Sequence, residues 1–486
     1  MRLLVFVHRW LGIVTCLLFL DWFASGIVMM YAQMPGFSEE DRLAALPGLD
    51  AARCQLSARG AIAGAAVSDV GSLKLTSLFA RPVWRILGLG VGWRTVFADN
   101  GEVETSFPYE QAQGSLQPFL TTGAHPRLIE TMNEPDQWTL EGDYGGLWPL
   151  YHFALDDSPR TQFYVASATG EVVLRTTARS RALAWMGAIP HWIYFASIRK
   201  HPEFWRQLVI WLAGIGCAVS LLGITVGIWR ISKSQRGPGG RRGQGWSPFV
   251  GVMRWHHWCG LIFGIVAFTW VFSGMLSMEP GSFSASTAPL SGQAEAFSGA
   301  ELDLRAWDAS PAKLIATRPS VKEIQIHQVA GKPYYVLTES GRGQELVDSS
   351  GRPVDSFQRD FLVAAAQRAV PEGKLIEESL LHDYDAYYYD REGSLSLPIW
   401  RLKFNDPRSS WLYIDPRRGA IAARYERSGR IARWLYHGLH SWDFPFLWRH
   451  RPAWDVVVVA LNGGGVFLSG TGIVIGFRRL RASMRH

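Results

Sequence analysis

Cysteine is scarce in this sequence, with four residues in 486. Three of them, Cys16, Cys217 and Cys259, fall in apolar runs, so the polar parts of the chain hold only Cys54. A disulfide framework is therefore excluded, and no CxxC pair is present for metal or redox chemistry. The sequence also lacks a Walker loop, a dinucleotide-binding fingerprint and a Ser-His-Asp arrangement, so we expect no nicotinamide or flavin domain on this chain.

Long apolar runs are what the sequence has instead. About 20 apolar residues are needed to cross a membrane, and four runs meet that length. The first run is too long for a cleaved signal peptide, and His8, Arg9 and Asp21 interrupt it. The four predicted transmembrane helices are Leu4 to Met30, Gln207 to Trp229, Val250 to Ser277 and Asp455 to Phe477.

Positive charge is concentrated beside these runs, which explains the net charge of +7. Positive residues mark the cytoplasmic side, so we expect both termini inside and the two long loops outside. Nucleic-acid binding is not expected, because the charges flank predicted spans. The flanking residues are Arg2 and Arg9, then Arg230, Lys233, Arg236, Arg241, Arg242 and Arg254, then Arg478, Arg479, Arg481 and Arg485.

The chain contains an internal duplication of one sequence unit. Arg181 to Arg230 aligns without a gap on Arg430 to Arg479, at an offset of 249. The start repeats at an offset of 248, where His8-Arg9-Trp10 returns as His256-His257-Trp258. Two parallel repeats in a membrane protein are related by a pseudo-twofold axis along the membrane normal.

Each long loop between the runs is predicted to form an α+β domain. Both show strand-like alternation, a turn at Asn100-Gly101 or Ser350-Gly351, and a helical run such as Phe361 to Val370. The predicted order is transmembrane helix 1 (1–31), outer domain 1 (32–181), an interfacial helix with transmembrane helix 2 (182–230), a cytoplasmic basic loop (231–249), transmembrane helix 3 (250–278), outer domain 2 (279–429), an interfacial helix with transmembrane helix 4 (430–479), and a cytoplasmic tail (480–486).

His8 and His256 lie about one turn inside the cytoplasmic ends of the first and third runs. Ionisable residues at such places are costly and usually functional. One interpretation is an interfacial pair that binds lipid head groups. The other is axial ligation of one haem iron, with one imidazole from each repeat, since helix bundles commonly hold such sites. His257 competes for this role, but its counterpart is Arg9, so the repeat favours His256.

A second repeated pair, His191 and His440, lies in aromatic-rich segments just before the second and fourth runs. An interfacial role among aromatic anchors is one interpretation, and ligation of a second haem near the outer face is the other. His437 lies one turn before His440 and could replace it. His201 and His450 also repeat, but they lie among Lys and Arg residues, and we expect them to meet lipid head groups.

Five motifs stand out along the chain: His8-Arg9-Trp10-Leu11-Gly12, Tyr384-Asp385-Ala386-Tyr387-Tyr388-Tyr389, Leu397-Pro398-Ile399-Trp400-Arg401, Trp411-Leu412-Tyr413-Ile414-Asp415-Pro416 and Gly438-Leu439-His440-Ser441-Trp442. These motifs resemble the PepSY-associated transmembrane family, and the resemblance covers nearly the whole chain. The first copy departs from the family pattern, because Ile189-Pro190-His191-Trp192 stands where a Leu-His form is expected.

The resemblance implies an α-helical integral membrane protein with four transmembrane helices, an internal duplication and two periplasmic α+β PepSY-like domains. Some members are reductases of ferric siderophores in the bacterial inner membrane and hold two b-type haems. By that similarity His8, His256, His191 and His440 are the axial ligands of haem iron. Electrons from a quinol or a cytoplasmic reductase would then reach a periplasmic ferric siderophore or other iron chelate.

Other functions stay open at this point. The chain could be a haem-free PepSY-type periplasmic module that binds a partner or regulates a peptidase. It could be a transporter, which the repeat would allow. It could also be a haem relay to an acceptor unrelated to iron uptake. No catalytic residue is assigned, and the sequence names neither the siderophore nor the oligomeric state.

Overall fold

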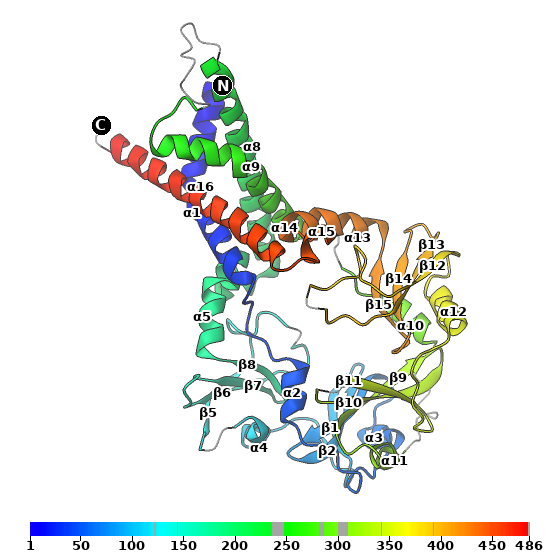
Figure 1. The fold of residues 1–486 in the computed structure, drawn as a ribbon. Coiled ribbons are helices and arrows are strands. Elements are labelled where there is room, and N and C mark those ends of the chain that lie inside the picture. Colours follow the sequence, from blue (N-terminus) through cyan, green and yellow to red (C-terminus); the bar gives the residue numbers. More distant parts are fainter. Residues whose placement is uncertain are drawn as a thin grey trace.

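The computed structural model describes residues 1–120, 123–142, 144–235, 247–280, 286–299, 310–341, 343–391 and 393–484. Four long helices form one part of the molecule, and three antiparallel sheets form the other (Figure 1). Both chain termini lie at the end of the helices that points away from the sheets (Figure 1). The predicted basic loop falls mostly outside the described residues.

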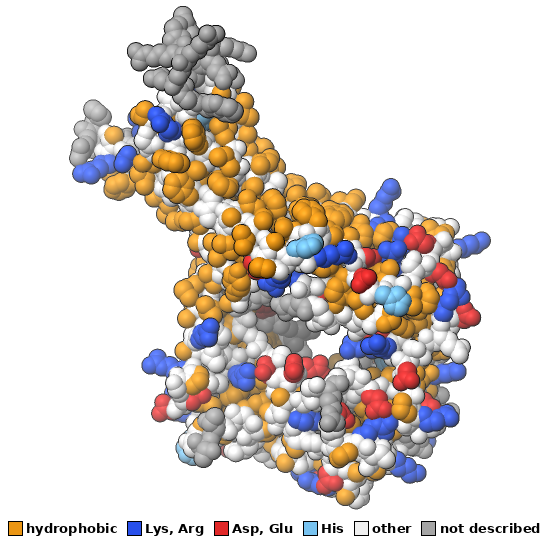
Figure 2. All heavy atoms as spheres, viewed as in Figure 1, with side chains coloured by type: hydrophobic (Ala, Val, Ile, Leu, Met, Phe, Trp, Pro, Cys, Tyr) orange, Lys and Arg blue, Asp and Glu red, His pale blue; other side chains and the backbone are white. Residues whose placement is uncertain are grey.

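The four long helices are α1 (Arg2–Met29), α8 (Pro202–Gln235), α9 (Val252–Leu276) and α16 (Ala453–Ser483). All four are long and apolar enough to span a membrane. Side chains such as Leu17, Trp211 and Phe477 point outward and are exposed. Figure 2 shows hydrophobic side chains covering the helical part, whereas Lys, Arg, Asp and Glu gather on the sheet part. A large exposed apolar surface of this kind marks contact with a membrane or a partner.

The largest sheet has seven strands in the order β11-β10-β9-β1-β2-β3-β4. A four-stranded sheet, β5 to β8, follows in the first loop, and another, β12 to β15, follows in the second. The strands are β1 (Val70–Leu78), β2 (Arg81–Gly88), β3 (Gly92–Phe97), β4 (Val103–Glu104), β5 (Pro126–Met132), β6 (Leu150–Leu155), β7 (Gln162–Ala166), β8 (Val172–Thr176), β9 (Val321–Val329), β10 (Lys332–Glu339), β11 (Gly343–Asp348), β12 (Leu375–Leu381), β13 (Ile399–Phe404), β14 (Trp411–Asp415) and β15 (Ala420–Tyr425).

The predicted class, an α-helical integral membrane protein with two periplasmic α+β PepSY-like domains, is wrong. Three antiparallel sheets make the described chain α+β, and one of them joins the two long loops. Strand β1 pairs with β9 through Lys74 opposite Gln325 and Leu75 opposite Ile324. An edge strand leaves backbone groups unpaired, so joining two edges satisfies both. Leu75 and Ile324 are also fully buried in one shared core.

The turns and the helix that the sequence predicts inside the loops agree with the structure. The Asn100-Gly101 turn lies between β3 and β4, with Gly101 at a φ of 78°. The Ser350-Gly351 turn follows β11 and leads to the bridge between Val347 and Pro353. The helix expected near Phe361 to Val370 is α12 (Arg359–Ala369).

Short helices connect each sheet part to a long helix. In the first copy these are α5 (Ala178–Met186), α6 (Ala188–Trp192) and α7 (Ala196–Arg199). In the second copy they are α13 (Arg427–Ala432), a π-helical turn (Arg433–Gly438), α14 (Leu439–Ser441) and α15 (Pro445–Trp448). Helix α6 packs against α1, and α14 packs against α9. The two interfacial segments are thus broken helices that place one histidine each against the bundle.

Candidate functional site: two histidine pairs along the helix bundle

The structure brings His191 and His440 together where the short helices meet the long ones. Their ring centres are 6.2 Å apart, and the ring planes are inclined at 68°. His191 comes from α6 and His440 from α14, so each repeat contributes one ring. The sequence repeat predicted this pairing, and the chain achieves it although α6 and α14 are only short pieces of helix.

Both rings of this outer pair are fixed in the same way. His191 Nδ1 lies 3.1 Å from the Trp22 carbonyl oxygen and 3.0 Å from Ser25 Oγ. His440 Nδ1 lies 3.2 Å from the equivalent carbonyl of Trp270 and 3.1 Å from Ser273 Oγ. A carbonyl only accepts, so Nδ1 carries the proton and donates it. Nε2 is then the unprotonated nitrogen, as metal-ligating histidines require.

Glycines make room for these rings. A Cβ at Gly26 would lie 3.4 Å from His191 Cε1, and one at Gly274 would lie 3.5 Å from His440 Cε1. Gly26 and Gly274 are counterparts in the repeat. Both histidines lie outside the four long helices, and burial lowers the pKa of both rings. The pKa of His191 falls to about 3, with the nearby His440 as the second cause, so the His191 imidazole is neutral near pH 7.

His8 and His256 form the inner pair, near the end of the bundle that holds the termini. His8 Nδ1 lies 3.1 Å from the Val219 carbonyl oxygen, and His256 Nδ1 lies 3.1 Å from Thr471 Oγ1. Both histidines line one cavity of about 460 Å³ between the four long helices. Their Nδ1 atoms are thus engaged by α8 and α16, as the outer pair's are by α1 and α9.

The inner cavity also carries positive charge. Arg9, Arg230 and Arg479 line it, and its described lining includes no Asp or Glu. Arg230 and Arg479 are counterparts at the 249 offset, so each repeat supplies one. The rest of the wall is mostly apolar side chains and glycines, with Thr15, Ser220, Ser469 and His257 as further polar groups. Such a wall suits a flat, largely apolar ligand with carboxylates at one edge.

Hydrogen bonding separates His257 from the paired histidines. His257 Nδ1 lies 2.9 Å from Ser247 Oγ, and its Nε2 lies 3.0 Å from the Gly227 carbonyl oxygen. Because a carbonyl can only accept, Nε2 carries the proton in His257 and has no lone pair to offer a metal. The preference for His256 over His257 therefore gains a physical reason that the sequence alone did not supply.

His437 differs from His440 in its charged surroundings. Burial lowers the pKa of His437 to about 4, and the guanidinium groups of Arg433 and Arg391 add to the effect. The positive charges of these two groups would repel a metal ion bound to His437, so His440 is the better metal ligand. His201 and His450 are both exposed, as expected for residues that meet head groups.

One neighbour of the outer pair was missed by sequence reasoning. The ring of Tyr436 stacks on His440, with ring centres 5.4 Å apart. Tyr436 lies in the π-helical turn, which no local sequence pattern predicted. The turn adds one residue to the helix, and π-bulges of this kind are frequent at functional sites.

The donor set at each of the two places is a pair of imidazoles. In the part of the chain that the structure describes, no group of three or more His, Cys, Asp or Glu side chains could hold a metal ion alone. A haem iron needs only axial ligands from the protein, so a pair of imidazoles suffices. With each nitrogen ~2.1 Å from a shared metal, two imidazole ring centres would be roughly 6.4 Å apart. The ring centres of His191 and His440 are 6.2 Å apart, which is close to that separation.

Comparisons with known proteins gave no further identification: no family model matches this chain, and no curated protein matches it.

Proposed function

We propose that this protein is a membrane-bound oxidoreductase that holds two b-type haems, one at His191 and His440 and the other at His8 and His256. The observation that carries the proposal is the symmetry of the outer pair. Each Nδ1 bonds to the carbonyl of an equivalent tryptophan, Trp22 or Trp270, and the ring centres are 6.2 Å apart. Anchors of this kind orient metal ligands and fix their tautomer.

The chain's own residues prepare both places. When bound, a haem supplies reversible one-electron exchange. The anchored imidazoles would present Nε2 without rearrangement, and the buried setting would keep water away. Arg230 and Arg479 would offset carboxylates at the inner place.

Orientation follows from the position of the arginines. Arg9, Arg230, Arg478 and Arg479 lie towards the helix ends near the chain termini (Figure 1). Positive residues mark the cytoplasmic side, so we place the termini inside and the sheets outside, in a bacterial inner membrane. The two histidine pairs then lie at different depths, and the outer pair is the one next to the sheets.

The proposed acceptor is a ferric siderophore or another iron chelate outside the membrane. Iron(II) is held far less well than iron(III) by chelators with hard oxygen donors, so reduction would release the metal without breaking the chelator. The support for this acceptor is the motif resemblance together with the two pairs at two depths. The sequence shows no nucleotide-binding fingerprint, so a quinol or a separate cytoplasmic reductase would supply the electrons.

Haem content tests the proposal directly. Protein purified in detergent from haem-replete cells should carry about two haems per chain, extractable by acid acetone because the sequence has no CxxCH motif. The pyridine haemochrome assay against protein mass measures this number. Chemically reduced protein should then be reoxidised by a ferric trihydroxamate, with ferrous iron caught by a chromogenic chelator. A colourless preparation would refute the proposal, and haem that no ferric chelate reoxidises would refute the acceptor.

A further inference from the structure

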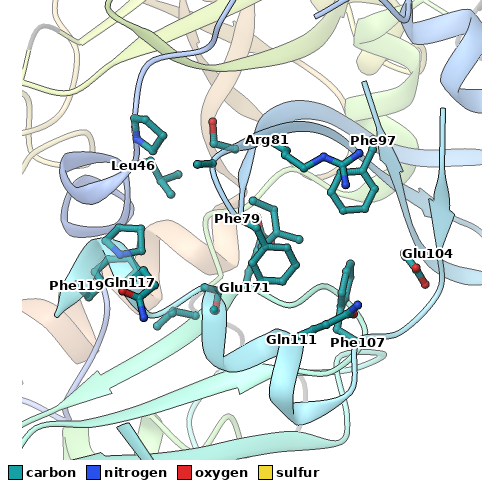
Figure 3. Close-up of a pocket in the computed structure, with 18 of the residues that line it drawn as sticks. Leu46, Phe79, Arg81, Phe97, Glu104, Phe107, Gln111, Gln117, Phe119 and Glu171 are labelled. Atoms are coloured by element: carbon teal, nitrogen blue, oxygen red, sulfur yellow. The ribbon is translucent and has the colours of Figure 1, made fainter. Parts of the chain in front are cut away.

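A second cavity, of about 560 Å³, lies in the outer part of the first copy. It is bounded by the β1–β2 turn, by the end of α2 (Glu39–Ala45), by α4 (Tyr109–Gly114) and by the 3-10 turn η1 (Gln117–Phe119). Figure 3 shows aromatic rings around it. They belong to Phe79, Phe97, Phe107 and Phe119.

The β1–β2 turn that borders this cavity has an unusual sequence. Phe79 and Ala80 have φ angles of 52° and 57°. A two-residue hairpin of this kind needs positive φ at both positions and normally uses Asn and Gly. The equivalent turn in the second copy has Ala330 at 49° and Gly331 at 78°, which is the less strained choice. The first copy thus tolerates strain at a position where Phe79 borders the cavity, and such strain is a pointer to function.

Contacts around the turns show that the two copies correspond here. Phe107 N donates to the Ser167 carbonyl oxygen at 2.8 Å, and Phe357 N donates to that of Pro416 at 2.7 Å. Gly170 packs on Phe107, and Gly419 packs on Phe357. The turn after Leu78 is therefore the counterpart of the turn after Val329, and α4 is the counterpart of α12.

In the second copy the chain itself fills this place. Helix α10 (Ser291–Ser298) ends against the β9–β10 turn, where Gly331 N donates to the Ser298 carbonyl oxygen at 2.6 Å. On the other side, Arg368 of α12 donates to the carbonyl oxygens of Ala296 and Phe297 at 3.3 and 3.4 Å. Phe297 is 3% exposed and packs in the core of this copy.

In the first copy the corresponding helix is held elsewhere. Helix α2 precedes α3 (Ala58–Ala65) and β1, as α10 precedes α11 (Pro311–Ile315) and β9. Strand β9 fixes α2 through two bonds: Arg42 Nη2 lies 2.7 Å from Glu323 Oε2, and Lys322 Nζ donates to the Leu43 carbonyl oxygen at 2.7 Å. The groove between the turn and α4 is therefore open at the place where α10 lies in the other copy.

We propose that this groove binds a short peptide segment of a partner protein, with one aromatic side chain in the place that Phe297 takes in the second copy. Helix α10 and its contacts are the internal template for the occupant. The lining has four glutamates, Glu102, Glu104, Glu110 and Glu171, but two arginines, Arg42 and Arg81. Arg42 pairs with Glu323, and Arg81 pairs with Asp99 and Glu102. Glu171 pairs with the buried Arg85, so Glu104 and Glu110 are the acidic groups of the described lining that have no ion pair. The groove therefore favours a peptide with net positive charge.

The test uses the full chain in detergent and a fluorescent peptide with the sequence of residues 290–298, read by anisotropy. The peptide should bind, and its Phe297→Ala form should bind at least about tenfold more weakly, because a buried aromatic anchor dominates such contacts. A Glu295→Lys peptide should bind several-fold more tightly than the parent, as the acidic lining requires. Empty micelles give the background.

Matched protein variants locate the binding. Gln111 is exposed and is the counterpart of Phe361, which stacks on Phe357 with ring centres 5.5 Å apart. Gln111→Phe should place a ring over Phe107, fill the groove and lower peptide affinity at least about tenfold. Arg59→Phe, at an exposed position of α3, adds the same ring elsewhere and should leave affinity unchanged.

Three outcomes would overturn the inference. They are no binding of the parent or the Glu295→Lys peptide to the native chain, equal binding of the parent peptide to the Gln111→Phe and Arg59→Phe variants, and displacement of the peptide by a stoichiometric ferric trihydroxamate. The last would assign the groove to the proposed acceptor. None of these results depends on haem content, so the groove and the proposed oxidoreductase function stand or fall separately.

Discussion

The two copies of the repeated unit agree closely at the histidines and diverge in the outer sheets. Each copy gives one anchored histidine to the inner pair and one to the outer pair, each packed against a glycine of a long helix. Farther out, the first copy has an open groove, whereas the second fills the equivalent place with α10. Under the proposed function the paired histidines would share one ligand and should therefore match in the two copies, whereas positions in the outer sheets do not have to meet that requirement.

A second difference lies beside the outer pair. Only the second copy has Arg433 and Asp443 at these positions, since their counterparts are Ala184 and Tyr194. Arg433 is 2% exposed and donates to the Asp443 carbonyl oxygen, and Tyr389 donates to Asp443 Oδ2 at 2.8 Å. Buried polar groups that bond to one another hold a segment in one arrangement. The first copy holds the equivalent segment in another way, because Gln137 Nε2 donates to the Tyr194 carbonyl oxygen at 2.7 Å.

Substituting the paired histidines is the change with the largest expected effect. His191→Ala and His440→Ala should each lose the same haem, and His8→Ala and His256→Ala the other, because in the proposed function each pair would hold one haem iron between the two copies. Each variant should retain about one haem per chain, since a single remaining imidazole holds the ring weakly. Pyridine haemochrome assays and difference spectra of the four variants measure this.

His257→Ala is the matched control for the inner pair, and His437→Ala for the outer pair. Both should keep the native haem content, because Nε2 of His257 already donates to the Gly227 carbonyl and His437 lies beside two guanidinium groups. If His8→Ala and His440→Ala removed one shared haem, the pairing by depth would be wrong. If only His257→Ala and His437→Ala lost haem, His257 and His437 would replace His256 and His440 as the proposed ligands.

The sequence supported prediction of the helices and of the pairs, but not of what joins the loops. Apolar length is a local property, so α1, α8, α9 and α16 could be foreseen, and the repeat offset predicted which histidines meet. The pairing of β1 with β9 depends on two strands about 250 residues apart, and nothing in Leu75 or Ile324 names its partner. The carbonyl anchors at Trp22 and Trp270 were equally hidden, because any residue supplies a carbonyl.

Alanine substitutions at two equivalent glycines should affect the inner haem to different extents in the two copies. A Cβ at Gly223 would lie 2.8 Å from His8 Cε1, whereas one at Gly472 would lie 3.5 Å from His256 Cε1. The His8 ring is held by the Val219 carbonyl and cannot move without losing that bond. Gly223→Ala should therefore lower retention of the inner haem several-fold, and Gly472→Ala should leave it near native. The number of haems per chain after gel filtration measures this difference. Equal losses in the two variants would contradict the prediction, because they would mean that the two glycine positions constrain the inner pair equally.

The smallest expected effect concerns two aspartates of the outer sheets, Asp99 and Asp348, which lie just before the Asn100-Gly101 and Ser350-Gly351 turns. Hydrogen bonds from Arg81, then from Arg53, lower the pKa of Asp99 from 3.8 to about 2. Burial pushes the pKa of Asp348 upward, but bonds from the Arg352 and Ser350 backbone and the Arg352 side chain lower it overall. Arg81 lies 2.7 Å from Asp99 and is largely covered, whereas Arg352 is 79% exposed and screened by water.

A carboxyl with a lowered folded-state pKa stabilises the fold above its unfolded value, and that contribution is lost as pH falls through the folded value. Asp99→Asn should therefore lower the free energy of unfolding by about 1 kcal/mol near pH 7, and Asp348→Asn by less, because exposed pairs contribute little. The deficit of Asp99→Asn should shrink between pH 3.8 and about 2. Urea unfolding followed by tryptophan fluorescence near pH 7 and near pH 3 measures both variants. If Asp99→Asn lowered the free energy of unfolding by the same amount at both pH values, the charge of the Asp99 carboxylate would not be the source of the stabilisation by Arg81.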